Sequence, residues 1–405
     1  MGIKSSFNSF LRDTCPDVFE PIHISEYSFQ KVAIDISLYL HKYKAVCGER
    51  WLSAFINLIA SLRRNEIHCV FIFDGKAPVE KSGEQEKRRD TRDKLDHKLY
   101  ELEEALDDYN KTGIVAKCII DLYSKSKSPK RLLGNRPGGV DMLWVEKKIK
   151  QRRGQLYDVS PKDFEDAREL FTILKVPFYT APGEAEKMCS AMCISGFVSA
   201  VLSEDTDVMA YGAPIFLTKI DTSSDTCVRI TNSRLIESLS LNKNKFLDLC
   251  IMCGTDYNPN ISKIGSKTSY KKVLEHGGID EIALETSLDV SVLNHIRVRQ
   301  LFTDFTCEDK AMIKIPYCGA PDFSFLEKFV SSRKINVNID KLCKDFTHNV
   351  VIFEGSEEEE VEEEIEEVEE EVEEEVEVEE EVEEEVEVEE EIEEDVEKEI
   401  EEEVK

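Results

Sequence analysis

Four acidic side chains flank a short apolar segment near the middle of the chain. Glu184 and Glu186 precede the segment 197–202, and Asp205 and Asp207 follow it. If they are gathered in one place, these carboxylates repel one another and their pKa values rise. A divalent cation relieves the repulsion, and Mg²⁺ or Mn²⁺ prefers carboxylate and water oxygens as ligands. The pattern predicts a site for such cations, and the alternative is a set of solvated surface acids.

The apolar segments before these acids predict the strands that position them. The segment 197–202 has the length and composition of a buried strand. Two further apolar runs, 31–35 and 69–73, end in or are followed by an acid, Asp35 and Asp74. Open α/β sheets bind ligands at the carboxyl ends of their strands. We therefore expect the acids at one edge of such a sheet, although an acid after a strand is also often a helix cap or turn residue.

Basic residues follow the second of these strands in a stretch with helix-forming composition, 80–110. Lys81 and Arg88 are seven positions apart and would share one helix face. Such a face beside the acids could hold a phosphate, whereas the alternative is an ordinary solvated helix. A second basic cluster occupies 147–153, after a run of basic and turn-forming residues that we expect to be a mobile loop.

The charge of the chain is concentrated at its end. The formal net charge is -32, and residues 357–405 alone hold 34 acidic residues and two lysines. The rest of the chain is therefore neutral, and the low isoelectric point does not argue against nucleic-acid binding. Like-charge repulsion in the Glu/Val tail favours disorder or a fluctuating helix. We expect the tail to bind basic proteins or the chain's own basic faces.

The cysteines and the hydropathy pattern indicate the compartment. The twelve cysteines form no tandem framework, which is typical of a reducing intracellular setting. Cys250 and Cys253 form a CxxC without a second pair, so buried thiols are expected rather than a zinc site. No apolar run reaches the length of a membrane span and no signal peptide is recognisable, so no membrane partner is expected.

The motifs in their order along the chain resemble a known family. They are MGIK, VAID, VFIFDGKAPVEKSGE, APGEAE, SEDTD and GTDY, and they span roughly residues 1–280. The set resembles the XPG family of structure-specific 5′ nucleases, which includes flap endonuclease and exonuclease-one. The resemblance implies an α/β fold, namely a PIN-like domain with a mostly parallel central sheet, a helical arch and a helix-two-turn-helix motif. It implies two Mg²⁺ ions, with Mn²⁺ as an alternative, and DNA with a 5′ flap, a nick or a free 5′ end as the partner.

The family's functional residues carry over position by position. The metal ligands that the resemblance implies are Asp35, Asp74, Glu184, Glu186, Asp205, Asp207 and Asp256. It implies that Lys81 and Arg88 contact the scissile phosphate. The other implied DNA contacts are Gly2, His41, Ile264, Gly265 and Lys267. The last three would lie in the helix-two-turn-helix motif, which grips duplex backbone through a K⁺ ion.

The chain also departs from the family pattern. His41 stands where flap endonucleases carry a stacking tyrosine, and Lys263 replaces the first glycine of the usual GIG hairpin. The interval between Asp74 and Glu184 is longer than in either branch, and no sliding-clamp motif precedes the acidic tail. We interpret the chain as a divergent member, of the kind that a large DNA virus or a protist would encode, acting in the nucleus or at a viral replication site.

Five segments and one leading function are expected. The segments are an N-terminal nuclease region with the first part of the arch at 1–110, a basic and mobile arch insertion at 111–160, an internal nuclease region at 161–280, a C-terminal extension at 281–355 and the acidic tail at 356–405. The expected function is hydrolysis of DNA phosphodiester bonds at 5′ flaps or free 5′ ends, in replication, repair or recombination. An RNA-directed PIN-type nuclease and a non-catalytic binder of DNA structures are the alternatives.

Overall fold

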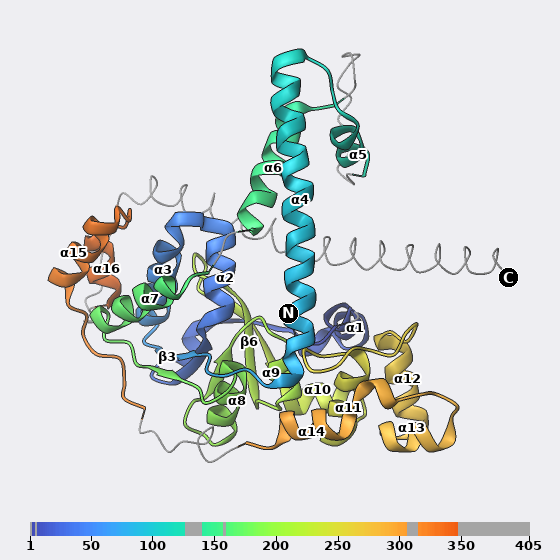
Figure 1. The fold of residues 1–405 in the computed structure, drawn as a ribbon. Helices are drawn as coiled ribbons and strands as arrows, with labels where there is room; N and C mark the ends of the chain where they lie inside the picture. Colours follow the sequence, from blue (N-terminus) through green and yellow to red (C-terminus); the bar gives the residue numbers. More distant parts are fainter. Residues whose placement is uncertain (1, 5, 126–139, 157–158, 306–314, 347–405) are drawn as a thin grey trace. The chain divides into compact units, whose positions relative to one another are not determined.

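A seven-stranded sheet forms the centre of the fold (Figure 1). The computed structural model describes residues 2–346 apart from 5, 126–139, 157–158 and 306–314. The chain divides into two units, Met1–His348 and Asn349–Lys405, and the second unit lies outside the described residues. The prediction of a disordered or helical tail therefore remains a prediction. Of the mobile loop expected at 124–131 and 135–139, only residues 124 and 125 are described, and they end helix α5 (Lys117–Lys125), so the rest of that loop also stays a prediction.

The order of the strands is β1-β7-β6-β5-β2-β3-β4. Their bounds are β1 Glu20–His23, β2 Lys31–Asp35, β3 His68–Phe73, β4 Phe178–Thr180, β5 Ala200–Leu202, β6 Ile215–Asp221 and β7 Thr226–Thr231. Strands β6, β5, β2, β3 and β4 are mutually parallel, whereas β7 pairs antiparallel with both β6 and β1. The sheet is thus mostly parallel, as predicted.

Alternate residues of the central strands enter two separate apolar clusters, one on each face of the sheet. On β2, Val32 and Ile34 join one cluster while Ala33 joins the other. The cluster that contains Val32 and Ile34 also includes side chains from five helices: α2 (Ile36–Cys47), α3 (Trp51–Arg64), α7 (Pro161–Ile173), α15 (Phe323–Arg333) and α16 (Ile339–Phe346). The second cluster, on the other face, includes side chains from eight helices: α1 (Phe7–Thr14), α8 (Ala185–Ile194), α9 (Asp207–Ala210), α10 (Asn232–Ser238), α11 (Lys243–Cys253), α12 (Ser266–His276), α13 (Ile279–Glu285) and α14 (His295–Thr303). Because both faces are covered, the central strands β2, β3 and β5 are apolar in their interiors rather than alternating with polar residues.

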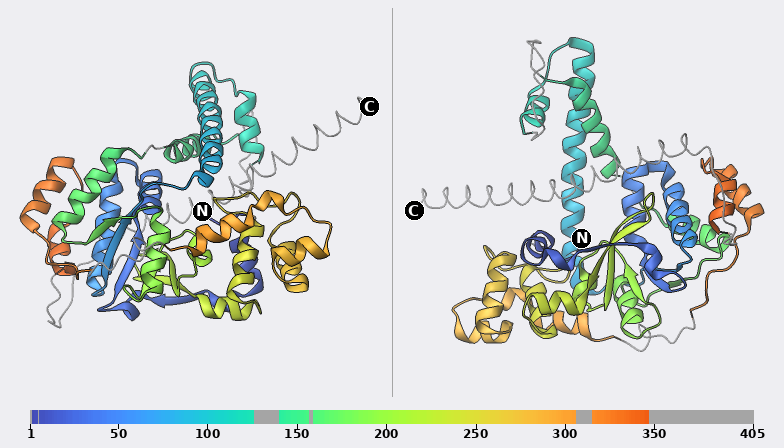
Figure 2. Two further views of the ribbon diagram at one scale, coloured as in Figure 1. Left: turned by 60° about the horizontal axis from the view of Figure 1, so that its bottom comes forward. Right: turned by 180° about the vertical axis from the view of Figure 1, so that it is seen from behind.

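The long interval after β3 folds into three helices with an apolar cluster of their own. Helix α4 (Ser82–Thr112) contacts α5 (Lys117–Lys125) and α6 (Met142–Gln155), and the views in Figure 2 show the three together. Their shared cluster includes Leu102, Ile119 and Val145. Arg153 of the second basic cluster donates to acids of α4 rather than standing alone. The described parts of 111–160 are therefore largely helical and pack on α4, and the expected mobility of this segment stays a prediction.

Two local expectations are tested by the described residues, and one of them is wrong. A capping box of Ser160 and Asp163 begins α7. Strand β5 begins at Ala200 rather than at 197. The reason is that Phe197 N bonds back to Met192 O (2.9 Å), in the turn that ends α8. Cys250 and Cys253 are buried thiols, as expected. None of the described helices is long and apolar enough to cross a membrane.

Candidate active site

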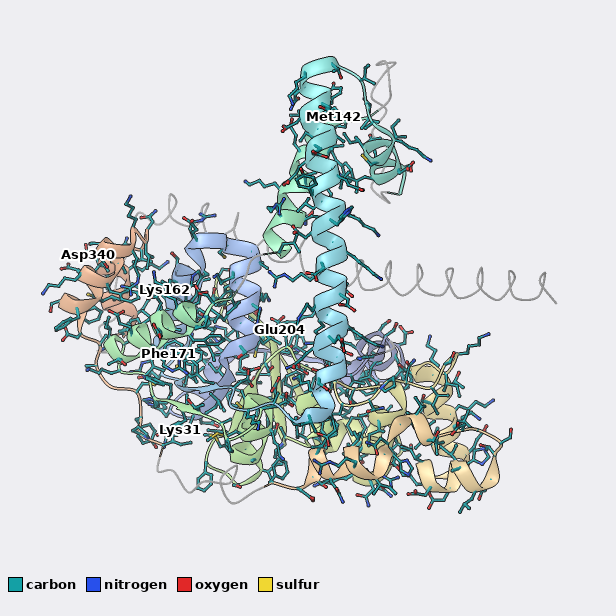
Figure 3. The ribbon with its side chains drawn as sticks, in the orientation of Figure 1. Lys31, Met142, Lys162, Phe171, Glu204 and Asp340 are labelled. Atoms are coloured by element: carbon teal, nitrogen blue, oxygen red, sulfur yellow. The ribbon has the colours of Figure 1, made fainter. Side chains whose placement is uncertain are left out.

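The acids meet at one edge of the sheet because the strands that carry them are parallel. Asp35 ends β2, Asp74 follows β3, and the pair Asp205 and Asp207 follows β5. Figure 3 labels one residue at each end of the parallel strands. Lys31 begins β2, at the amino ends, and Glu204 follows β5, at the carboxyl ends where the acids lie.

The other three acids come from helix ends. Glu184 is the N-cap residue of α8 and Glu186 lies in its first turn. Asp256 follows α11 after a glycine, Gly254, that has a positive φ of 87°. The segment thus turns sharply to return an acid to the sheet edge.

Close backbone contacts join the loops after β3 and β4. Gly75 N donates to Gly183 O (2.7 Å), and Ala185 N donates to Asp74 Oδ1 (2.8 Å). A Cβ atom on Gly75 would lie 2.0 Å from Ala181 O, so only glycine fits there. These contacts hold Asp74 against the start of α8, beside Glu184.

The acids are mostly removed from water and affect one another. Asp35 and Asp207 are buried, with exposed fractions of 1% and 5%. Burial, and then the charge of Asp74, raises the pKa of Asp35. Burial, and then Asp205 and Asp256, raises the pKa of Asp207. Burial and the charges of other acids also raise the pKa of Glu186. The site therefore accumulates negative charge that needs a counter-charge.

Two basic residues at the start of α4 reach into this group of acids. Lys81 Nζ lies 2.6 Å from Glu184 Oε1 and 3.1 Å from Asp256 Oδ2. Arg88 Nη2 donates to Asp256 Oδ1 (2.8 Å). Burial alone would lower the pKa of Lys81, but Glu186, Glu184 and Asp256 outweigh it and raise that pKa. Lys81 is therefore a cation held inside the acid group.

The site's donor atoms suit hard divalent cations. The described residues contain no group of three or more His, Cys, Asp or Glu side chains already arranged to hold a metal ion. However, Glu186 Oε2 and Asp207 Oδ1 are buried and accept no hydrogen bond. Such oxygens are costly unless a partner binds them. Carboxylate oxygens that are free to bind are the ligands that Mg²⁺ or Mn²⁺ prefers. The predicted ligand residues are therefore chemically suited to these ions.

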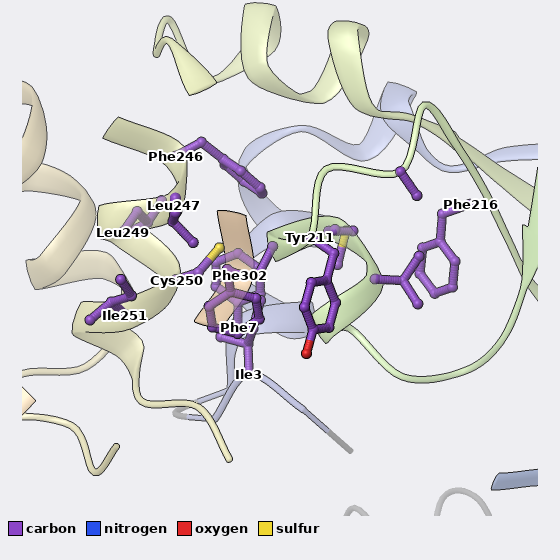
Figure 4. Close-up of a cluster of buried hydrophobic side chains, with 14 of the residues drawn as sticks. Ile3, Phe7, Tyr211, Phe216, Phe246, Leu247, Leu249, Cys250, Ile251 and Phe302 are labelled. Carbon is purple, nitrogen blue, oxygen red and sulfur yellow. The ribbon is translucent and has the colours of Figure 1, made fainter. Parts of the chain in front are cut away.

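A buried hydroxyl chain supports Glu184, and sequence reasoning missed it. Tyr257 OH donates a hydrogen bond to Glu184 Oε2, and it shares a second hydrogen bond with Tyr211 OH. The ring of Phe302 in α14 contacts both tyrosine rings, at centroid distances of 5.2 Å for Tyr257 and 4.8 Å for Tyr211. Figure 4 shows Tyr211 and Phe302 in this cluster. The only local signal was that Tyr257 follows Asp256 directly.

The structure brings Gly2 and His41, two of the predicted DNA contacts, close to this region. Gly2 is buried with a φ of 92°, and a Cβ there would lie 2.2 Å from Asp205 Oδ1. His41 is exposed on α2, yet desolvation by surrounding protein, and then the charges of Arg92 and Arg88, lower its pKa. His41 thus lies close enough to Arg92 and Arg88 of α4 to feel their charges.

The remaining predicted contacts lie apart, at the start of α12. Gly265 is the N-cap of this helix, and Lys267 in its first turn bonds Asp13 (3.0 Å). The side chain of Ile264 is buried in the core, so only its backbone can meet DNA. Lys263 has a φ of 61°, the region that glycine adopts most easily, which explains why a glycine is usual there.

Comparisons of the sequence with known proteins identify the family to which the chain belongs. The XPG N-terminal domain matches residues 1–95, and the XPG I-region matches residues 175–256. A protein of Invertebrate iridescent virus 3, described as a probable RAD2-like endonuclease, is 32% identical over 330 residues, which cover 75% of this chain and 85% of that protein. The chain therefore belongs to the XPG family of RAD2-like endonucleases.

Solved structures share the fold. The catalytic core of Rad2 in complex with a DNA substrate matches with a TM-score of 0.57 and 16% identity, covering 83% of this chain and 98% of that chain. Flap endonuclease-1 from Methanococcus jannaschii matches with a TM-score of 0.52 and 21% identity, covering 82% and 95%. The predicted PIN-like α/β fold is confirmed.

Proposed function

We propose that this protein is a metal-dependent, structure-specific 5′ nuclease that hydrolyses DNA phosphodiester bonds at 5′ flaps or free 5′ ends. The observation that carries the proposal is the group of buried acids at the carboxyl edge of the sheet, with Lys81 and Arg88 among them. Membership of a family of endonucleases supports the reaction class.

The seven acids, Asp35, Asp74, Glu184, Glu186, Asp205, Asp207 and Asp256, would hold two divalent cations. When bound, such a pair supplies an activated water and neutralises the departing oxygen. Lys81 and Arg88 bind the phosphate and stabilise the charge that develops on it. Arg88 is suited to this because its side chain is 46% exposed, while Lys81 is largely enclosed.

The DNA would meet two regions of the protein. Gly2 and His41 lie on the side of the acids, and the turn at Lys263–Gly265 presents backbone N–H groups at the start of α12. A helix start of this kind can position a phosphate of duplex DNA, with a K⁺ ion as a further ligand of the turn. We propose the nucleus or a viral replication site as the place where the protein acts, because proteins of viruses are among its relatives.

One gel assay tests the proposal against its alternatives. Radiolabelled 5′ flap, nicked, blunt and single-stranded RNA substrates are incubated with the protein and Mg²⁺, with chelator as the control. We expect cleavage of the flap substrate that requires the cation. Preferred cleavage of RNA would support the RNA-directed nuclease instead, and binding of all DNA structures without cleavage would support the non-catalytic binder.

A further inference from the structure

A short segment crosses the edge of the sheet opposite the acids. This segment, residues 315–322, is called the strap below. Lys31 Nζ at the start of β2 donates to Ile315 O (2.6 Å) and lies over the ring of Tyr317 (4.2 Å). The strap continues to Gly319 N, which donates to Lys175 O (2.9 Å). It joins the side of the fold that carries α14 to the side that carries α15 and α16.

Two thiols meet where the strap passes β3. With Cys318 protonated, its Sγ donates to Cys69 O (3.3 Å), and the two side chains also hydrogen-bond to each other. Cys69 has an exposed fraction of 0%, whereas Cys318 keeps 8%. The pair therefore has an inner thiol and an outer thiol.

The surroundings favour the charged form of the outer thiol. Cys318 N donates to His68 Nδ1 (3.1 Å), and Arg63 Nη1 approaches the same nitrogen (3.1 Å). The hydrogen bond from Cys69, with His68 and the Arg63 charge, lowers the pKa of Cys318 to about 5. The same hydrogen bond, and then burial, raises the pKa of Cys69. Cys318 is therefore the more acidic thiol of the pair, and its thiolate is the nucleophilic form.

We propose that Cys318 and Cys69 form a peroxide-sensitive thiol pair whose oxidation links the strap to β3. The Cys318 thiolate attacks one oxygen of hydrogen peroxide, forming an S–O bond and releasing hydroxide. The Cys69 sulfur then attacks the Cys318 sulfur, and the sulfenic oxygen leaves as water with the Cys69 proton. In sum, one thiolate, one thiol, one hydrogen peroxide and one proton give one disulfide and two waters.

Other close cysteines lack these features. Cys250 and Cys253 are spaced for a CxxC, and Cys189 lies four residues before Cys193. Burial raises the pKa of all four thiols. They serve as internal controls, because a general attack on buried thiols would oxidise them as well. Since the strap lies at the other edge of the sheet, the linkage should leave the acid site unchanged.

The test uses the full-length protein. It is treated with hydrogen peroxide, alkylated, digested without reductant and analysed by mass spectrometry, alongside Cys318→Ser and Cys343→Ser. We expect most of Cys69 and Cys318 in one disulfide-linked peptide that dithiothreitol removes. The linked peptide should persist in Cys343→Ser, whose changed residue lies in α16, and disappear in Cys318→Ser. Oxidation of Cys318 to sulfinic acid without linkage, or equal oxidation of Cys250 and Cys253, would overturn the proposal.

A second measurement needs no variant. The wild-type protein is alkylated with iodoacetamide over a pH series, and each cysteine is followed by peptide mapping. Cys318 should react at mildly acidic pH, well below the usual thiol pKa of about 8.5. Reaction of Cys318 only in alkaline solution, in parallel with Cys343, would contradict the proposal even if Cys318→Ser failed to fold.

Discussion

The Lys81 ammonium lies 2.6 Å from Glu184 Oε1, inside the acid group that would bind the cations. This contact gives the buried acids a counter-charge and keeps a cationic side chain at the place where a phosphate would arrive. The same residue therefore serves the stability of the site and, in the proposed reaction, the charge on the phosphate.

Replacing Lys81 should affect the chemical step more than DNA binding. In Lys81→Ala we expect the single-turnover rate on a 5′ flap to fall by roughly two to three orders of magnitude, as for loss of one electrostatic partner at a reacting centre. Lys87→Ala, on the exposed side of α4, is the control and should cleave normally. An unchanged single-turnover rate with weaker binding would reassign Lys81 to general attraction of DNA.

The hydroxyl of Tyr257 should increase the affinity of the site for cations, because it positions the carboxylate of Glu184. Tyr257→Phe keeps the ring contact with Phe302 but removes the hydrogen bond to the carboxylate. Because a hydrogen bond to a charged group contributes about 1.5–3 kcal/mol, we expect cation affinity to fall by roughly tenfold or more. Calorimetric titration of the protein with Mg²⁺ measures this without any substrate.

Tyr100→Phe provides the matched control for that experiment. Tyr100 OH also donates to a glutamate, Glu104 (3.1 Å), but on the exposed surface of α4. Its loss should leave the affinity for the cation unchanged. Equal effects of the two substitutions, or none of Tyr257→Phe, would show that the hydroxyl does not position Glu184.

The packing of α6 on α2 depends on a glycine. A Cβ on Gly154 would lie 2.7 Å from Ala45 O, whereas a Cβ on Gly83 of α4 meets nothing within 4 Å. Gly154→Ala should force α6 away from α2, increase amide hydrogen exchange there and reduce cleavage. Gly83→Ala should be neutral or stabilising by up to about 1 kcal/mol, as expected for alanine in a helix. Equal exchange in both variants would contradict this account of how α6 packs on α2.

Asp163 should contribute stability that depends on pH. Burial would raise its pKa, but hydrogen bonds from Lys44 and Ser160 outweigh burial and lower it. A lowered pKa means that the charged form stabilises the fold above the unfolded value of about 3.9, and that this contribution is lost as the pH falls through the folded value.

The comparison is urea unfolding of the wild type and of Asp163→Ala. At neutral pH we expect the variant to lose about 0.5–2 kcal/mol, the usual value of a helix cap, with the ion pair to Lys44 (2.7 Å) adding to it. The difference should shrink in solutions more acidic than the unfolded pKa. A difference that stays constant across this range would mean that packing, not charge, accounts for the loss.

The acids that follow the strands could be predicted from the sequence. Asp35, Asp74 and Asp205 each come after an apolar run, and parallel strands bring their carboxyl ends to one edge. By contrast, the contact of Tyr257 with Glu184 joins positions 73 residues apart, and no local pattern signals it. Periodicity did not predict helices α5 and α6 either, because their apolar residues, such as Val145 in α6, stand among closely spaced charges.

The central claim is that the buried acids hold cations for cleavage, and Asp205→Asn tests it most directly. The change keeps the shape of the side chain and removes one ligand charge, while the basic residues remain. Single-turnover cleavage of a 5′ flap at saturating Mg²⁺ is measured together with DNA affinity, with exposed Asp289→Asn as the control. The account predicts a fall of at least about two orders of magnitude in rate with DNA binding retained. Cleavage by Asp205→Asn at a rate near that of the wild type would contradict it.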